Sequence, residues 1–439
     1  MASSLKSRLA RIRERASDTP SANGASGQAV QGSAQRKVQA SAGAPSSAQA
    51  LTERGWSELF PGLWQREIIF PLPDAGTAPA MVRLHRWRLS SAGGAARQGA
   101  APEEGAALHA EPTDIPLSAL SSFDLETTGL SGGAGTVAFL AAFGRIIEGT
   151  FKVRQYFMDD YPAEPAFLDC IGAEMEASGL VLSYNGASFD LPLYRTRCVL
   201  NGMKPSAPPY ALDLLHPARR LWRRTLADCS LGSIERSVLG IERAEDLPGA
   251  LVPEAYFRFL KEGFHRELGL AMDHNAGDVY ALARLFLAME RALDGSPPPY
   301  GDTLGLAVLI SRFDRARADS LLEGLLAAAD AGGDAGSRAD AAASLMRSYW
   351  RQGRKRERLA LAPCLKDDAR GLLLKSLYEE RLSENLEASL SYARRALAEA
   401  SLIAGKRGEA LALRAAKRVL RLQLCLRRVT GEPDGNEAR

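Results

Sequence analysis

Residues Ser121 to Gly133 read SSFDLETTGLSGG and place two carboxylates, Asp124 and Glu126, one residue apart at the end of a short apolar run. In a β-strand, residues i and i+2 point to the same face, so both carboxylates would emerge side by side where a strand ends. Like charges that close repel each other and need a cation or a shared proton. The pair alone is consistent with a metal site, an acid/base pair or an acidic loop.

Two further segments carry carboxylates in similar settings. Asp190 follows the strand-and-turn pattern LSYNGASFD, and Asp278 lies in DHNAGDVYALARLF, on the same helical face as His274 four residues earlier. Four carboxylates from three segments form an oxygen-rich set suited to Mg²⁺ or Mn²⁺. Two such ions roughly 3.5–4 Å apart could clamp the attacking and leaving oxygens of a phosphodiester. His274 could take the proton from the attacking water, because the ordinary histidine pKa is near operating pH.

The elements that must position these residues form a unit at 114–296. SSFDL, TVAFLAAFGRII, FKVRQYFM and GLVLSYN are predicted strands, and Glu148-Gly149-Thr150 is a predicted hairpin turn. Helices are predicted at 165–178, after Asp190, Asp213 and Ser230, and at 268–293. A strand meander followed by alternating strands and helices indicates an α/β fold with a mixed sheet flanked by helices.

The rest of the chain divides by composition. The pattern predicts a basic helix at 1–16, with an organelle-targeting segment as the alternative, and a disordered Ser/Ala/Gly-rich linker at 17–54. At 55–92 we expect a β extension of the central unit, with GLWQREIIFPL and MVRLHRWRL as strands, and at 93–113 a flexible loop.

Residues 300–430 are predicted to be all helical, and two stretches resemble degenerate tetratricopeptide helix pairs. Positive charge concentrates here: residues 351–439 hold 20 Lys and Arg against 12 Asp and Glu, although the whole chain has a net charge of only +3. The tail could bind a nucleic acid backbone, but a protein partner is the favoured interpretation.

Overall composition excludes several classes. The 439 residues are 46% hydrophobic and 24% charged, as in water-soluble globular proteins, and no apolar run is long enough for a membrane span. Five scattered cysteines without a CxxC pair argue against a disulfide framework or a zinc site. We therefore expect a cytoplasmic protein with no membrane partner.

The three carboxylate motifs resemble those of the DEDD superfamily of 3′–5′ exonucleases, which have a ribonuclease H-like fold. SSFDLETTGL is similar to the first motif, YNGASFDLPL to the second and HNAGD to the third. DLLHPARRLW, CSLGSIERSVLGI and DLPGALVPEAYFRFL resemble a narrower group of bacterial ribonuclease H-like proteins with tetratricopeptide repeats after the nuclease domain. The resemblance implies a hydrolase that shortens single-stranded DNA or RNA from the 3′ end with two Mg²⁺ or Mn²⁺ ions.

The resemblance also implies residue roles. Asp124 would bridge both metals, Glu126 and Asp278 would complete the water-activating site, Asp190 would serve the second metal, and His274 would be the base. Thr127 would lie near the terminal 3′ hydroxyl, Leu130 would wedge against the last base, and Asn185 would hold the substrate strand or support the carboxylates.

One departure concerns His274. It lies four residues before Asp278, where a tyrosine subgroup of the superfamily has its base, and Asp273 stands where the histidine subgroup has its base. Two alternatives therefore stay open: a catalytically inactive binding module, and a structure-selective endonuclease. Asp213 and the Arg219–Arg224 segment around Trp222 are each open to a structural or a substrate-binding interpretation.

Overall fold

The computed structural model describes residues 46–73, 76, 78–87, 89–91, 114–129, 135–243, 245, 247–296, 299–330 and 335–430. The chain divides into two compact units, residues 1–300 and 301–439. The predicted helix at 1–16, the loop at 93–113 and Leu130 lie outside the described residues.

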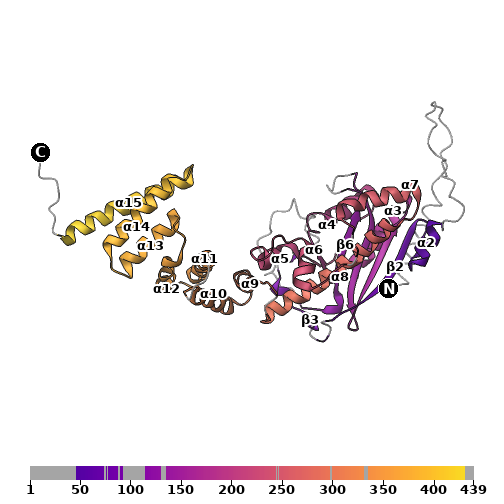
Figure 1. The fold of residues 1–439 in the computed structure, drawn as a ribbon, viewed down its shortest axis with the longest axis horizontal. Helices are drawn as coiled ribbons and strands as arrows, with labels where there is room; N and C mark the ends of the chain where they lie inside the picture. The colour runs from indigo at the N-terminus through magenta and orange to yellow at the C-terminus, as the bar shows by residue number, and fades with distance from the viewer. Residues whose placement is uncertain are drawn as a thin grey trace, which may run out of the picture. The chain divides into compact units, whose positions relative to one another are not determined.

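The first unit is built on an eight-stranded mixed sheet with the order β1-β2-β8-β7-β6-β9-β10-β4 (Figure 1). Neighbouring strands are antiparallel from β1 to β6, β6, β9 and β10 are parallel, and β4 pairs antiparallel at the far edge. The strands are β1 (Ser57–Phe60), β2 (Leu63–Pro71), β4 (Ser90–Ser91), β6 (Leu120–Thr127), β7 (Ala138–Ile147), β8 (Thr150–Met158), β9 (Leu180–Ser183) and β10 (Tyr210–Asp213). A second, two-stranded sheet pairs β3 (Met81–Val82) with β5 (Ile115–Pro116). The predicted mixed sheet is confirmed.

Local sequence explains the β7–β8 hairpin. Glu148 and Gly149 both have positive φ angles, 51° and 75°, at the turn between the two strands. Two consecutive left-handed residues give a turn whose twist matches that of the flanking strands. This turn sets the register in which Ala142 pairs with Gln155, which matters for the site described below.

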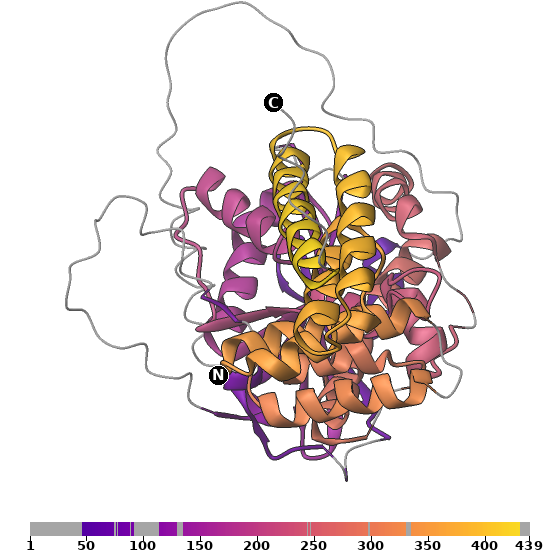
Figure 2. The same ribbon diagram turned by 90° about the vertical axis from the view of Figure 1, so that its left-hand side faces the viewer.

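Helices cover the sheet, and the two views in Figures 1 and 2 show them around its strands. They are α3 (Glu164–Glu176), α4 (Asp190–Leu200), α5 (Leu215–Trp222), α6 (Leu231–Ile234), α7 (Val252–Glu262) and α8 (Arg266–Asp294); a short π-helical segment (Glu235–Leu239) follows α6. The longest, α8, contacts β6, β7 and β8 through a run of buried residues, so it can place polar side chains over the middle of the sheet.

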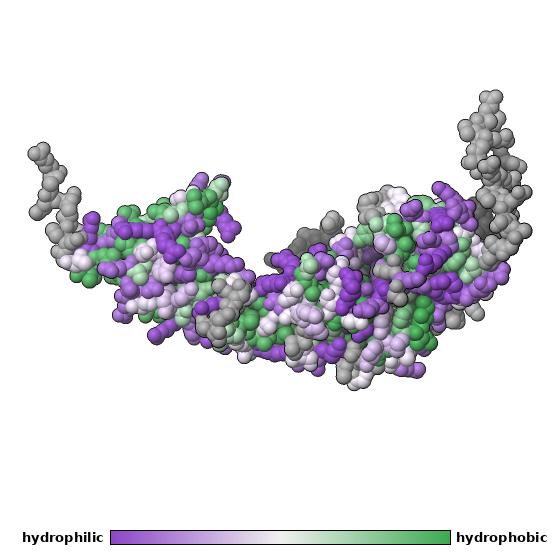
Figure 3. Space-filling model, viewed as in Figure 1, coloured by the Kyte–Doolittle hydropathy of each residue, from purple (hydrophilic) through white to green (hydrophobic). Residues whose placement is uncertain are grey.

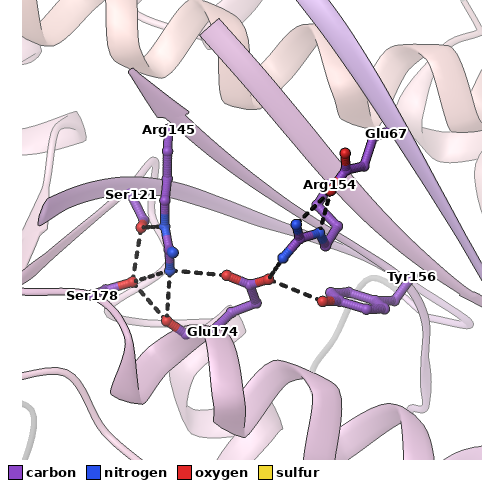
Figure 4. Close-up of polar contacts among 7 residues, drawn as sticks. All are labelled: Glu67, Ser121, Arg145, Arg154, Tyr156, Glu174 and Ser178. Atoms are coloured by element: carbon purple, nitrogen blue, oxygen red, sulfur yellow. Dashed lines mark hydrogen bonds and ion pairs between the residues drawn. The ribbon is translucent and has the colours of Figure 1, made fainter. Parts of the chain in front are cut away.

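The face of the sheet that carries Ser121 is fixed to α3 by a buried charge cluster (Figure 4). Glu174 of α3 accepts hydrogen bonds from Arg154 and from the Tyr156 hydroxyl, both at 2.9 Å, and pairs with Arg145 at 2.9 Å. Arg145 also donates to Ser121 Oγ at 2.7 Å. Burial, followed by the nearby Glu174 carboxylate, raises the pKa of Tyr156 well above its ordinary value. Side chains alternate along β6, so this cluster lies on the opposite face from Asp124.

Two expectations about the N-terminal region are wrong in part. Residues 47–53, at the end of the predicted linker 17–54, form helix α2 (Ser47–Glu53), capped by the Ser46 hydroxyl. Its one large apolar residue, Leu51, is fully buried in the main core, which supplies the packing that composition alone did not indicate. The described residues of the predicted strand MVRLHRWRL contain only β3 and a 3₁₀ turn (Leu84–Arg86), and β4 begins just after this stretch. Arg86, within this turn, pairs with Glu290 of α8 at 3.1 Å.

The second unit is all helical, as predicted. Its helices are α9 (Thr303–Ile310), α10 (Arg315–Asp330), α11 (Ala335–Arg351), α12 (Lys355–Ala360), α13 (Ala369–Arg381), α14 (Leu386–Ser401) and α15 (Lys406–Thr430). Neighbouring helices pack through small leucine and alanine clusters. Hydrophobic residues also reach the surface along α15, where Leu413, Leu420 and Leu424 are exposed (Figure 3). No helix in the described part of the chain is long and apolar enough to cross a membrane.

Candidate functional site

Asp124 belongs to a row of side chains that crosses four strands. It pairs with Ala142 of β7, Ala142 pairs with Gln155 of β8, and Gln155 pairs with Arg66 of β2. Directly paired residues project from the same face of a sheet, so all four side chains lie beneath α8. Ala142 is fully buried and small, which leaves room above it for a bridging side chain.

Asn275 of α8 fills that room and completes a buried hydrogen-bond chain. Arg66 Nε donates to Gln155 Oε1 at 2.7 Å, Gln155 Nε2 donates to Asn275 Oδ1 at 2.9 Å, and Asn275 Nδ2 donates to Asp124 Oδ2 at 2.8 Å. An arginine can only donate and a carboxylate accepts, so the two ends fix the orientation of both amides. We call these residues, Arg66, Gln155, Asn275 and Asp124, the Asp124 relay.

Arg66, at the outer end of the Asp124 relay, is bound by the carboxylate of Asp273. The Asp273 carboxylate accepts from Arg66 Nη2 at 2.9 Å and from Arg54 Nη2 at 2.7 Å. Arg66 is almost fully buried, its guanidinium lies 4.9 Å from the Trp56 ring centroid, and burial lowers its pKa. Asp273, at the position where the histidine subgroup carries its base, therefore supports the relay from the far side of Arg66.

Asp190 is the first residue of α4 and is only 5% exposed. The turn before it is closely packed. Asn185 has a φ of 66°, and only glycine fits at position 186, because a Cβ there would lie 2.5 Å from Ser183 Cβ and 3.0 Å from Asp190 Oδ2. Asp213, at the end of β10, accepts hydrogen bonds from the backbone N–H groups of Asn185, Ala187 and Leu215. Asp213 thus has a structural function in tying this turn to the sheet.

Asp278 and His274 share a face of α8 and meet Arg243 there. The His274 Nε2 atom lies 3.5 Å from Asp278 Oδ2, and Arg243 pairs with Asp278 and with Glu235. Arg243 Nη1 also lies 2.8 Å from His274 Nδ1. Because a guanidinium N–H only donates, Nδ1 is the acceptor, and the proton of the neutral imidazole is assigned to Nε2, on the Asp278 side.

The carboxylates are close enough to affect one another. Burial raises the pKa of Asp124 well above its ordinary value, with further increases from the neighbouring charges of Asp278, Asp190 and Glu126. Burial, followed by Asp213, raises the pKa of Asp190 to about 7, although a backbone hydrogen bond opposes the shift. Three strand-end and helix segments therefore bring four acidic groups to one partly buried place.

This donor set fits a hard divalent cation chemically, because it offers only carboxylate oxygens, and mutual repulsion is relieved by a bound cation. Among the described residues, however, no group of three or more His, Cys, Asp or Glu side chains stands in an arrangement that could hold a metal ion. Asp278 is instead paired with Arg243.

The other predicted site residues differ in their exposure to solvent. Thr127, the last residue of β6, is buried and its hydroxyl donates to the Gly129 carbonyl at 2.8 Å. Glu126 is half-buried near the strand end, and the Asn185 residue is exposed. Trp222 is fully buried and donates to the Pro299 carbonyl, so the stacking function suggested for it is wrong.

Five further residues at the site do not belong to any of the predicted roles: Arg66, Gln155, Asn275, Arg243 and Glu235. The sequence gives a signal for two of them: Gln155 stands at a position where the alternation of FKVRQYFM predicts an apolar residue, and Asn275 stands beside His274 in HNAGD. Arg243 lies in a segment without helical or strand periodicity, so its proximity to Asp278 depends on tertiary structure alone.

Comparison with known proteins agrees with this fold. The RNase_H superfamily model matches residues 122–290, a span that contains the four carboxylates and His274. An uncharacterised protein of Bacillus subtilis (strain 168), YprB, is 39% identical over 173 residues, which are 39% of this chain and 42% of the relative. The chain thus matches less than half of the length of that relative. Residues 122–290 are thus similar to the RNase_H superfamily, whereas residues 46–71, which supply Arg54 and Arg66, lie outside the matched span.

Proposed function

We propose that the chain is a divalent-metal-dependent 3′–5′ exonuclease that hydrolyses phosphodiester bonds at single-stranded nucleic acid ends. The observation that carries this proposal is the position of Asp124 beside three other carboxylates in a partly buried site, which raises the pKa of Asp124. A buried cluster of acids is costly unless a cation or protons neutralise it. The match to the RNase_H superfamily gives the cluster a nuclease context.

In this proposal, Asp124 would serve both of two Mg²⁺ or Mn²⁺ ions, Glu126 and Asp278 would hold one of them, and Asp190 would hold the other. When bound, the ions would supply Lewis-acid stabilisation of the attacking and leaving oxygens. The chain's own contribution is to fix the carboxylates, and the Asp124 relay does this from the sheet side. Partners that orient metal ligands commonly change metal affinity or activity by about 10–100-fold when they are removed.

His274 is the proposed base. Its surroundings restrict when it can act, because Arg243 uses the Nδ1 lone pair while Nε2 carries the proton facing Asp278. His274 can therefore accept a proton only after the Arg243 guanidinium moves. Thr127, Leu130 and Asn185 are proposed to contact the terminal nucleotide, by resemblance to the exonuclease motifs.

Cleavage of an end-labelled oligonucleotide tests the proposal. A 5′-labelled single strand should be shortened progressively from its 3′ end in Mg²⁺ or Mn²⁺, should survive in EDTA, and should survive with the Asp124→Asn variant. Glu174→Gln, which alters the buried cluster on the opposite face, should retain activity in the molecules that remain folded.

Two results would refute the proposal in different ways. Cleavage of a circular single strand would identify an endonuclease. Inertness on single-stranded DNA and RNA with both metals would indicate a binding module, and the Arg243–Asp278 pair is the observation that favours this second candidate.

A further inference from the structure

The helical unit contains two neighbouring hollows that the proposed nuclease site does not use. The larger, about 610 Å³, lies between α11 and α13, and the smaller, about 260 Å³, is lined by residues of α13 and α15. Arg370 lines both hollows. The two are therefore treated as one surface, which we call the tail groove.

The tail groove combines an exposed aromatic ring with arginines. Trp350 lines the larger hollow and is 66% exposed, whereas Met346 beneath the same surface is buried. An exposed indole costs solvation free energy unless a partner covers it, and a flat ring is the group on which nucleic acid bases stack. The larger hollow therefore offers a stacking position.

Five arginines line the two hollows of the tail groove: Arg347, Arg358, Arg370, Arg407 and Arg414; the first three share the larger hollow with Trp350. In the part of the chain that the structure describes, the guanidinium groups of Arg358, Arg370, Arg407 and Arg414 make no hydrogen bond or ion pair. Planar guanidinium groups without a carboxylate partner suit phosphate oxygens, which they can bind in a bidentate manner.

The acidic residues of the tail groove are already engaged. Asp340 pairs with Lys366 at 3.1 Å, and Asp368 caps α13 by accepting from the Gly371 N–H at 2.7 Å. The net field of the groove is therefore positive. No Asn or Gln side chain lines either hollow, so neither offers a side-chain amide to pair with a peptide backbone. These two features favour a phosphodiester chain over an acidic peptide.

We infer that the tail groove binds a segment of single-stranded nucleic acid, with a base stacked on Trp350 and backbone phosphates on Arg370 and its neighbours. This inference deepens the proposed function, since it assigns a second contact for the same class of substrate. It replaces the protein partner that the sequence favoured for this region.

The test measures binding without cleavage. The full chain carrying Asp124→Asn is titrated into a fluorescently labelled single-stranded oligonucleotide in EDTA, and anisotropy gives the Kd at several salt concentrations. Trp350→Ala should weaken binding by about fivefold or more, the lower range for loss of one stacked base. Trp350→Phe should recover part of the loss. Arg370→Ala should lower the salt slope by about one.

Arg428→Ala is the matched control, because Arg428 is exposed on α15 and lines neither hollow. Circular dichroism melts check that each variant is folded. The inference is overturned if Trp350→Ala binds as the parent does, or if Arg428→Ala weakens binding as much as Arg370→Ala. It is also overturned if the part of the tryptophan fluorescence that Trp350→Ala removes responds to an acidic peptide and not to the oligonucleotide. The binding assay contains no metal and uses an Asp124 variant that is not expected to cleave. Its result therefore does not depend on whether the wild-type chain cleaves nucleic acid.

Discussion

Arg243 stands where a cation would be needed. Its guanidinium contacts Asp278, Glu235 and His274, and burial opposes the positive charge of Arg243 itself. The nearby carboxylates raise the pKa of Arg243 above its ordinary value despite burial. Arg243 therefore offsets part of the repulsion at Asp278, the member of the acidic cluster that it contacts.

We therefore predict that Arg243→Ala lowers the free energy of unfolding of the metal-free protein by about 1–3 kcal/mol, because it leaves carboxylates without their hydrogen-bond donor. Mn²⁺ should stabilise this variant more than it stabilises the wild type. Thermal melts with EDTA and with Mn²⁺ measure both effects. Arg266→Ala, which removes an exposed partner of Glu245, should change stability by less than about 0.5 kcal/mol. Equal Mn²⁺ shifts for Arg243→Ala and wild type would contradict this account.

Asp190 gives a pH prediction at the same scale. Its pKa is raised to about 7 in the folded protein, so the folded state binds a proton more tightly than the unfolded state does. The resulting stability is fully present below about pH 4 and is lost as the pH rises through 7. In metal-free protein, Asp190→Asn should match wild type near pH 4 and be more stable at pH 8, by at most about 4 kcal/mol. Urea unfolding at several pH values measures this, and a difference that stays constant with pH would refute it.

At the scale of elements, strand register and one helix face together build the Asp124 relay. The pairing of β6, β7, β8 and β2 puts Asp124, Ala142, Gln155 and Arg66 in one row, and α8 lays Asn275 over Ala142. Asn275 and Gln155 are both fully buried. Loss of either amide leaves buried polar groups unpaired.

Asn275→Ala should reduce metal affinity or cleavage by about 10–100-fold and should destabilise the protein by about 1–3 kcal/mol. The double variant with Gln155→Ala should lose less free energy of unfolding than the sum of the two single losses, because both substitutions break the same chain of hydrogen bonds. Glu174→Gln provides the control: it should destabilise the fold through the cluster in Figure 4 without changing metal affinity. Additive losses for Asn275 and Gln155 would mean that the two amides act independently.

The same scale shows what sequence patterns could predict. Alternation and turn residues are local, so β6, the β7–β8 hairpin and the strand that precedes Asp190 were predictable from periodicity and from Glu148-Gly149. Cross-strand register is not local, and the link from Arg66 to Asp124 depends on it. The neighbourhood of Arg243 depends on the path of an irregular segment, and α2 depends on a single buried leucine, Leu51. Neither has a periodic signal.

At the scale of the whole molecule, two units with different chemistry share one chain. The first holds a partly buried acidic cluster in a region that matches the RNase_H superfamily, and the second holds a basic, partly aromatic groove. An acidic site with metal ions and a basic groove are both suited to a polyanionic substrate. The central claim, on which the proposed chemistry depends, is that the acidic cluster binds divalent metal.

Calorimetric titration of Mn²⁺ into the full metal-free chain tests that claim most directly. We predict saturable binding by wild type and by Glu174→Gln, weaker binding by Asn275→Ala, and loss of binding by Asp124→Asn. Absence of Mn²⁺ binding to the folded wild-type chain, or the same affinity and stoichiometry for Asp124→Asn and wild type, would contradict it.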